Sequence, residues 1–288
     1  MATLGEWRVD VVEDGRFGLD GGAMFGIIPR PLWSRKNPPD DQNRIELGLR
    51  CLLLRRGETV LLVDTGMGER WPDSARAQFR IERDPVPGLI DNLAALGVAP
   101  EQVTDVLLTH LHFDHNGGTV RPDGQLTFPR AMHHAGRKQL ARALAPSPKD
   151  AGSFRPEDRD GLVEGDNLKL YDAGDRLMDG IDLLGADGHT EGMLLPRLRA
   201  GGETIVFCAD LLPTASHLHL PWVMGYDCMP VTSIAEKADL LEQAEAGGWI
   251  LVYEHDPEID ASRVTRDARG RYARGEEVDL GGRPRSWN

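Results

Sequence analysis

Short apolar runs bounded by turn-forming residues recur along the chain. Arg44–Leu54 and Thr59–Val63 are two such runs, separated by Arg56-Gly57, and they predict a pair of neighbouring strands. An Asp-Thr-Gly turn at residues 64–66 follows the second strand. Similar runs predict further strands at Val103–Thr109, Leu168–Tyr171, Ile181–Leu184, Met193–Leu198, Thr204–Cys208 and Trp249–Tyr253.

Two other segments repeat their apolar residues with the period of an α-helix. Pro87–Leu96 begins with proline and is followed by Gly97, and Ser233–Ala246 is amphipathic and ends before two glycines. By contrast, residues 145–167 predict a surface loop, and residues 261–288 predict a charged tail with a short hairpin. Strand runs and helices therefore alternate twice, which is typical of two sheets packed face to face and flanked by helices.

Composition narrows the class of protein and of partner. The 288 residues suffice for one large domain or two small ones. A net charge of -13 disfavours nucleic acid and anionic membrane surfaces as partners. We expect no signal peptide and no membrane span, because the start lacks basic and apolar regions and no apolar run approaches about 20 residues. Cys51, Cys208 and Cys228 form no Cys-x-x-Cys pair, which favours reduced thiols in a cytoplasmic protein and excludes a cysteine zinc knuckle.

The strongest chemical signal is a cluster of histidines directly after a predicted strand. In His110-Leu111-His112-Phe113-Asp114-His115, four side chains that bind metals lie within six residues. Imidazole and carboxylate groups suit a borderline ion such as zinc, and the absence of cysteine leaves a nitrogen and oxygen site. A lone histidine is usually structural, but four such residues at one strand end indicate a metal site.

Three further candidates follow other predicted strands. His189 lies in a glycine-flanked turn, Asp210 ends one strand and His255 ends another. Loops at one edge of a sheet converge on one pocket, so we expect these residues to join the cluster. His217 and His219 repeat the His-x-His spacing without the following Asp-His, and we expect them near the pocket mouth rather than on a metal.

The ordered set of motifs resembles the metallo-β-lactamase superfamily over about residues 44–256. The set is Asp-Thr-Gly after a strand, His-x-His-x-Asp-His, Gly-His-Thr, a strand-end aspartate and a strand-end histidine. The resemblance implies a four-layered αββα sandwich as one domain over residues 1–288, in which residues 1–43 extend the pocket. It also implies a homodimer and two divalent ions, with zinc expected and manganese, iron or cobalt as alternatives. In this family pattern one ion would be held by His110, His112 and His189, and the other by Asp114, His115 and His255. Asp210 would bridge the two ions. Asp64 would orient the ligand loop.

Departures from particular relatives narrow the expected activity. The common dizinc β-lactamases have cysteine where Asp210 stands, and flavodiiron relatives have glutamate where His112 stands. The acidic balance also argues against the RNA-processing relatives. With these activities disfavoured, we expect the protein to hydrolyse an ester, thioester, lactone or phosphotriester. The alternative is that it is a non-catalytic metal-binding module. Two neighbouring cations lower the pKa of a shared water toward about 7, which supplies hydroxide for the attack.

Two softer matches point toward the substrate. Asp20–Gly26 and the stretch from Asp210 to Lys237 are similar to quorum-quenching lactonases and methyl-parathion-hydrolase-like enzymes. We therefore expect a small neutral substrate, a lactone first and a phosphotriester second, with Asp114 or Asp210 carrying the proton. Lactonases place a tyrosine where this chain has Pro213, and Tyr226 is the candidate replacement. The expected pocket wall consists of Met24, Phe25, Leu218, Trp222 and Met224.

Overall fold

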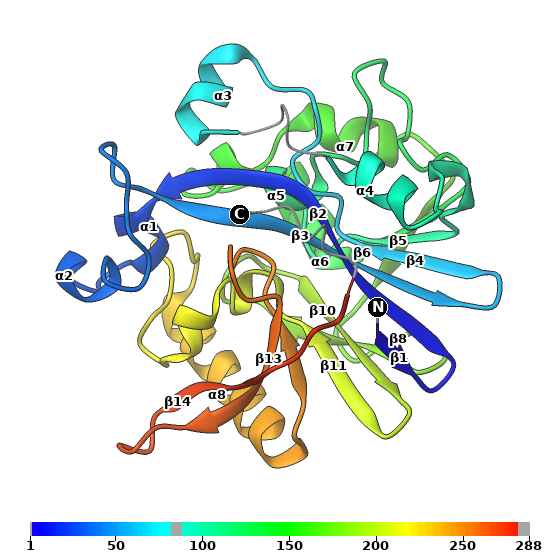
Figure 1. Cartoon of the computed structure of the whole chain (residues 1–288). Helices are drawn as coiled ribbons and strands as arrows, with labels where there is room; N and C mark the ends of the chain where they lie inside the picture. Colours follow the sequence, from blue (N-terminus) through cyan, green and yellow to red (C-terminus); the bar gives the residue numbers. More distant parts are fainter. Residues whose placement is uncertain (1, 82–87, 282–288) are drawn as a thin grey trace.

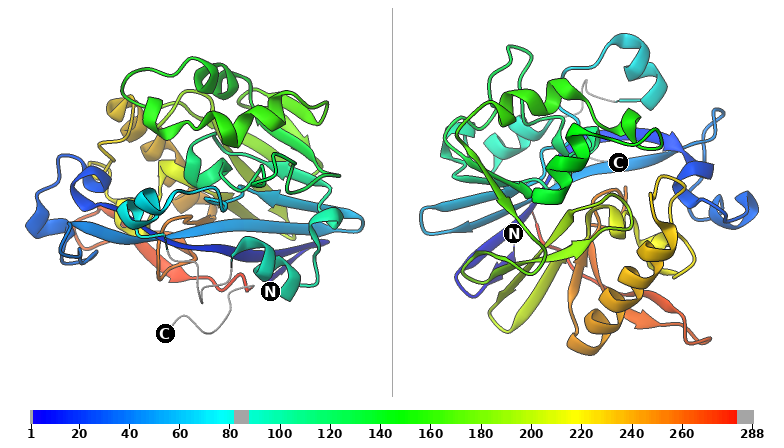
Figure 2. Two further views of the ribbon diagram at one scale, coloured as in Figure 1. Left: turned by 90° about the horizontal axis from the view of Figure 1, so that it is seen from above. Right: turned by 180° about the vertical axis from the view of Figure 1, so that it is seen from behind.

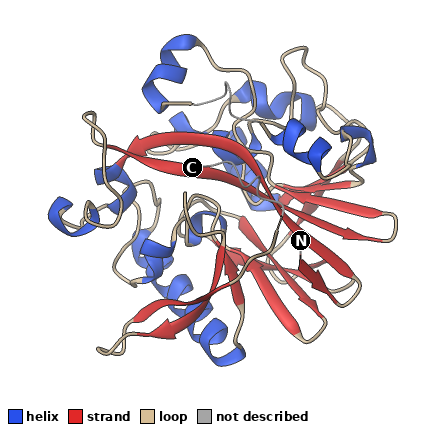
Figure 3. Cartoon of the chain, in the orientation of Figure 1, coloured by secondary structure: helices blue, strands red, loops and turns tan. Residues whose placement is uncertain are grey.

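Two β-sheets, each of seven strands, form the centre of the protein. Both sheets are visible in Figures 1 and 3. The computed structural model describes residues 2–81 and 88–281. The first sheet uses the first part of the chain, and its strands lie side by side in sequence order. They are β1 (Ala2–Leu4), β2 (Trp7–Asp20), β3 (Arg44–Arg56), β4 (Thr59–Val63), β5 (Asp105–Leu107), β6 (Met132–Gly136) and β7 (Leu168–Tyr171).

The second sheet uses the later part of the chain and is also ordered by sequence. Neighbouring strands are antiparallel except β11 and β12, which are parallel, as are the pairs from β4 to β7 in the first sheet. Its strands are β8 (Arg176–Met178), β9 (Ile181–Ala186), β10 (Met193–Ala200), β11 (Glu203–Phe207), β12 (Ile250–Val252), β13 (Ala261–Arg266) and β14 (Tyr272–Glu277).

Helices cover the outer faces of both sheets, which gives four layers (Figure 2). The first sheet is covered by α4 (Leu89–Ala95), α6 (Arg137–Leu144) and α7 (Pro156–Val163), and the second by α8 (Pro230–Gly247). Within the described ranges, no helix is long and apolar enough to cross a membrane. Shorter helices in the connections are α1 (Gly21–Phe25), α2 (Arg30–Trp33), α3 (Asp73–Phe79) and α5 (Phe113–Asn116).

The apolar pattern of β3 shows why the layers form. Successive strand residues point to opposite faces, and in β3 both faces are buried. Leu52 and Leu54 belong to the core between the sheets, which also contains Phe207 of β11. Leu53 packs with Leu93 of α4 in a second core, on the helix side of the first sheet. A nearly continuous apolar run is therefore what this central strand needs.

The αββα sandwich predicted from the sequence is confirmed. The prediction of a surface loop over residues 145–167 was wrong in part, because Pro156–Val163 forms α7 and buries Leu162 under it. The long strand β2 and the short strand β6 were not predicted at all. The helix start expected at Pro87 lies outside the described residues.

Candidate metal centre

The candidate ligands lie in loops that follow strands of both sheets. From the first sheet come His110, His112, Asp114 and His115, which follow β5. From the second sheet come His189, Asp210 and His255, which follow β9, β11 and β12. The structure brings all of these side chains together at one end of the sandwich, and their binding of metal stays a prediction.

Two glycines let the ligand loop pack tightly on the turn after β4. A β-carbon on Gly117 would lie 2.3 Å from the carbonyl oxygen of Met67, and one on Gly118 would lie 2.2 Å from that of Thr65. Glycine is therefore required at both positions, because a side chain would collide with these backbone oxygens. Thr65 in turn donates from its backbone N–H to the carbonyl oxygen of His115 at 2.8 Å. The ligand loop is therefore fixed by backbone contacts before any ion binds.

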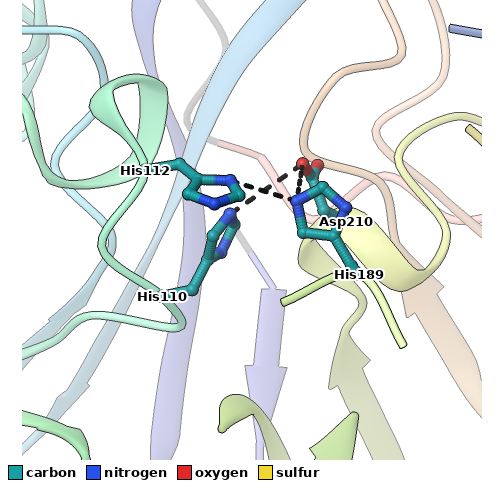
Figure 4. Close-up of side chains that lie close together, drawn as sticks. All are labelled: His110, His112, His189 and Asp210. Carbon is teal, nitrogen blue, oxygen red and sulfur yellow. Dashed lines mark hydrogen bonds and ion pairs between the residues drawn. The ribbon is translucent and has the colours of Figure 1, made fainter. Parts of the chain in front are cut away.

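The first group of candidate ligands consists of His110, His112, His189 and Asp210, which are drawn in Figure 4. Its four members each offer one ligand atom, and these atoms all lie within 4.8 Å of one another. Asp210 Oδ2 lies 3.1 Å from His189 Nε2 and 3.9 Å from His110 Nε2. His112 Nδ1 lies 3.1 Å from His189 Nε2. Three imidazole nitrogens and one carboxylate oxygen therefore face a common point.

The second group lies beside the first and shares Asp210 with it. Its members Asp114, His115 and His255 also offer ligand atoms within 4.8 Å of one another. The other carboxylate oxygen, Asp210 Oδ1, lies 3.1 Å from His255 Nε2 and 3.6 Å from His115 Nε2. Each oxygen of Asp210 thus faces one group, which is the arrangement that a bridging ligand requires.

The partners of the histidine ring nitrogens in the second group fit a bound cation. His255 Nδ1 donates to the carbonyl oxygen of Gly48 at 2.8 Å, and His115 Nδ1 faces the carboxylates of Asp64 and Glu254. With Nδ1 directed at these oxygens, each ring turns its Nε2 toward the other, and the two Nε2 atoms are 3.2 Å apart. Two ring nitrogens at this distance need a proton or a metal ion between them. With the adjacent carboxylates, the donor set suits zinc.

Burial and charge act in opposite directions on these side chains. Burial lowers the pKa of His110 and His112, and the neighbouring imidazoles lower it further. Burial also acts to lower the pKa of His189 and His255, but the Asp210 carboxylate raises both to about 9. Burial acts to raise the pKa of Asp210 itself, yet the surrounding histidines hold it well below its usual value. Asp210 therefore remains an anion between the two groups.

Asp64 lies behind the ligand loop and contacts it, and its role toward a metal stays a prediction. Its Oδ1 accepts from the backbone N–H of Thr109 at 2.7 Å, and its Oδ2 accepts from the Thr109 hydroxyl at 2.7 Å. Oδ2 also lies 3.1 Å from His115 Nδ1, on the side of the ring away from the ligand atom. The backbone of Asp64 has a φ of +59°, a left-handed conformation that aspartate tolerates better than most residues.

The sequence analysis missed two carboxylates that orient histidines. Asp227 Oδ1 accepts from His189 Nδ1 at 2.9 Å, and Glu254 Oε2 lies 2.9 Å from His115 Nδ1. Burial raises the pKa of Glu254 to about 8, although His115 acts to lower it. The position of Glu254 next to His255 was the available signal. Nothing local marked Asp227, because its partner lies 38 residues away.

Four of the five predicted pocket residues share one apolar cluster, Leu218 belongs to the core between the sheets, and most of the five are covered. Met24 and Phe25 are buried, and the Phe25 ring stacks on His217 with ring centroids 4.9 Å apart. Leu218 and Met224 are also buried, and Trp222 is half-buried. Met24 and Phe25 therefore have a packing role in the structure. Contact of the five predicted pocket residues with a substrate stays a prediction.

His217 takes no part in either ligand group. Its Nε2 lies 2.9 Å from the carbonyl oxygen of Met24, and its Nδ1 lies 2.8 Å from the Thr214 hydroxyl. Burial lowers its pKa to about 3, so the ring is neutral. The side chain therefore ties the loop after Asp210 to helix α1.

Tyr226 is half-buried, and its phenol is affected by the charge of Asp114. Burial raises the pKa of Tyr226 to about 12, and the charges of Asp20 and Asp114 contribute to the increase. The phenol therefore keeps its proton at neutral pH. Tyr226 packs against the same apolar cluster as Met24 and Phe25.

Aromatic side chains that the sequence analysis did not single out surround Phe113, which stands between two candidate ligands in the sequence. The Phe113 ring lies 5.3 Å from that of Trp71 and 5.4 Å from that of Phe79, measured between centroids. Phe113 is half-buried, whereas Phe25 has no exposed surface. Phe113 therefore keeps part of its apolar surface exposed and is adjacent in sequence to two candidate ligands.

Comparisons with known proteins agree with this geometry. A family model described as the metallo-beta-lactamase superfamily matches residues 46–255. The N-acyl homoserine lactonase AttM of Rhizobium johnstonii is 30% identical over 183 residues, which is 60% of this chain and 66% of the relative. The match thus spans about two thirds of that relative's length.

Solved structures give the same picture. A probable metal-dependent hydrolase from Staphylococcus aureus superposes with a TM-score of 0.87 at 25% identity, covering 96% of this chain and 100% of the other. AidC, a dizinc quorum-quenching lactonase solved with the product N-hexanoyl-L-homoserine, gives a TM-score of 0.80 at 21% identity and covers 96% of each chain. At that identity, the likeness to AidC establishes a shared fold.

Proposed function

The chain belongs to the metallo-beta-lactamase superfamily of metal-dependent hydrolases, and from this we propose that it holds two metal ions and opens neutral lactones, acyl-homoserine lactones among them. The observation that carries the proposal is the position of Asp210, whose two oxygens face two separate groups of ligand atoms. The likeness to N-acyl homoserine lactonase AttM supports the choice of substrate.

We propose zinc as the ion, with manganese, iron and cobalt as alternatives. When bound, a pair of such ions supplies a nucleophilic hydroxide at neutral pH and polarises the substrate carbonyl. Their proposed ligands are those derived above: His110, His112 and His189 for one ion, Asp114, His115 and His255 for the other, and Asp210 for both.

The chain's own residues would handle the proton and orient the substrate. Asp114 Oδ2 lies 3.8 Å from His255 Nε2. Asp114, with Asp210 as the alternative, would accept the proton of the attacking water and pass it to the leaving alkoxide. The protonated phenol of Tyr226 would donate a hydrogen bond to the lactone carbonyl.

The surface beside the ligands favours an apolar, uncharged substrate. Phe113 and its aromatic neighbours Trp71 and Phe79 offer a wall that suits an acyl chain. The net charge of -13 works against anionic substrates such as phosphomonoesters. Lactones and phosphotriesters both meet these conditions. We favour lactones because their planar carbonyl would need only the Tyr226 phenol beside it.

A substrate panel on zinc-loaded protein tests the proposal. We expect kcat/KM for at least one acyl-homoserine or aliphatic lactone to exceed that for paraoxon by about tenfold or more, which corresponds to about 1.4 kcal/mol in the barrier. The panel should also include aryl esters and thioesters. A phosphotriester hydrolysed faster than every lactone would make phosphotriesters the main substrates, and no turnover on any member would point to a non-catalytic metal-binding module.

Replacing Tyr226 with phenylalanine tests the phenol. If the hydroxyl donates to the carbonyl during attack, Tyr226→Phe should lower kcat for a lactone by about 10- to 100-fold and change KM little, because one donor to a developing negative charge is lost. Steady-state kinetics with one lactone measures the split. An unchanged kcat would assign Tyr226 to packing alone.

A further inference from the structure

Arg50 of β3 is a fully buried arginine at the seam between the two sheets. Its side chain has an exposed fraction of 0%, and its Nη2 forms ion pairs with Glu13 Oε1 at 2.9 Å and with Asp260 Oδ1 at 2.7 Å. A buried cation is costly unless it is paired and hydrogen-bonded. The two carboxylates meet the first condition and fix the plane of the guanidinium.

The remaining hydrogen bonds of this guanidinium go to the segment that carries His255. Nη1 donates to the carbonyl oxygen of Tyr253, and Nη2 donates to that of Asp256 at 3.1 Å. These two carbonyls lie on either side of Glu254 and His255 in the chain. The backbone N–H of Arg50 also donates to the carbonyl oxygen of Glu254 at 3.1 Å. Arg50 thus contacts three backbone carbonyls of this segment, those of Tyr253, Glu254 and Asp256.

Those contacts set the orientation of the His255 ring through Gly48, two residues away on β3. Gly48 donates from its backbone N–H to the carbonyl oxygen of His255 at 3.1 Å, and its own carbonyl accepts from His255 Nδ1 at 2.8 Å. Any shift of the segment along β3 would break this pair of bonds and move the Nε2 atom. Sites of this kind tolerate displacements of only about 0.5 Å.

We infer that Arg50 is a positioning residue for His255 and that it thereby sets the affinity for one ion of the pair. This inference rests on the proposed function, because it needs two ions. The ion concerned is the one assigned to Asp114, His115 and His255. The ion assigned to His110, His112 and His189 has no ligand on the segment that Arg50 holds.

Arg50→Lys tests the inference with the charge preserved. A lysine ammonium has three donors at one point instead of a planar fork of five N–H groups, so it cannot serve both carboxylates and both carbonyls. Titration of the apo protein with zinc ions should give two binding steps for the wild type. In Arg50→Lys, the zinc affinity of the step that depends on His255 should fall by about 10- to 100-fold, while the affinity of the other step stays unchanged. His255→Ala supplies the reference for complete loss of that step.

Arg55→Lys is the matched control. Arg55 lies on the same strand, pairs with the buried Asp10 and donates to the carbonyl oxygen of Leu96 at 3.2 Å. It is five residues from Arg50, roughly 17 Å along the strand. We expect the Arg55→Lys variant to have a lower melting temperature than the wild type and the same two zinc affinities.

The two affinities separate a positioning role from a merely structural one. Equal weakening of both steps in Arg50→Lys, or a lower melting temperature with both affinities intact, would overturn the inference. If Arg50→Lys does not fold, Asp260→Asn carries the same test, because it removes one carboxylate from the guanidinium, and the same unequal loss is expected. A wild type that binds fewer than two zinc ions would overturn the proposed function as well, whereas two ions without lactone turnover would leave the inference on Arg50 standing.

Discussion

Replacing Asp210 with alanine is expected to release both ions and to lower kcat/KM for a lactone by about a thousandfold or more. Each oxygen of this carboxylate faces a different group of histidines, so its loss affects both groups at once. Bound ions contribute several kcal/mol to stabilising the transition state, and each 1.4 kcal/mol corresponds to about tenfold in rate. Elemental analysis of the purified variant, together with lactone kinetics, measures both effects.

His219→Ala is the control for Asp210→Ala. His219 is half-buried, lies in the loop after Asp210 and packs on Trp222 with ring centroids 5.5 Å apart. It belongs to neither ligand group in the described part of the chain. We expect the variant to keep its metal content and most of its activity. If His219→Ala proved as damaging as Asp210→Ala, the ligand assignment would be wrong.

Removal of the metal should abolish turnover and destabilise the fold. An ion present at about a thousand times its dissociation constant stabilises the folded state by about 4 kcal/mol, and domains of this size shift by about 2–4 °C per kcal/mol. Chelation should therefore lower the melting temperature by about 8–16 °C for each ion lost. Thermal unfolding with chelator, and again after zinc is added back, measures the shift. A melting temperature that ignores both treatments would argue against a bound ion.

The ligand cluster could be predicted from the sequence because its signals are local. His110 to His115 lie within one loop, and His189, Asp210 and His255 each follow an apolar strand run. The orienting carboxylates could not be predicted in this way. Asp227 meets His189, and Glu254 meets His115, only after the two sheets pack.

Strand β2 was missed for a related reason. Asp10, Glu13 and Asp14 interrupt its apolar pattern, yet all three are buried. Asp10 pairs with Arg55, Glu13 pairs with Arg50, and Asp14 accepts from backbone N–H groups of Met67 and Leu89. Charged residues are strand-compatible here because distant segments of the chain satisfy them, and a local pattern does not contain that information.

The division of the chain between the sheets has a consequence for how the protein comes apart. The first sheet ends at Tyr171 and the second begins at Arg176, so each half of the chain supplies an incomplete set of ligands. Metal bound across this boundary would act as a cross-link between the halves. Separation of the halves would then require the ions to dissociate first, so metal loss would be the slow step of unfolding. Resistance to proteolysis would then depend on the rate of metal loss rather than on the equilibrium between folded and unfolded protein.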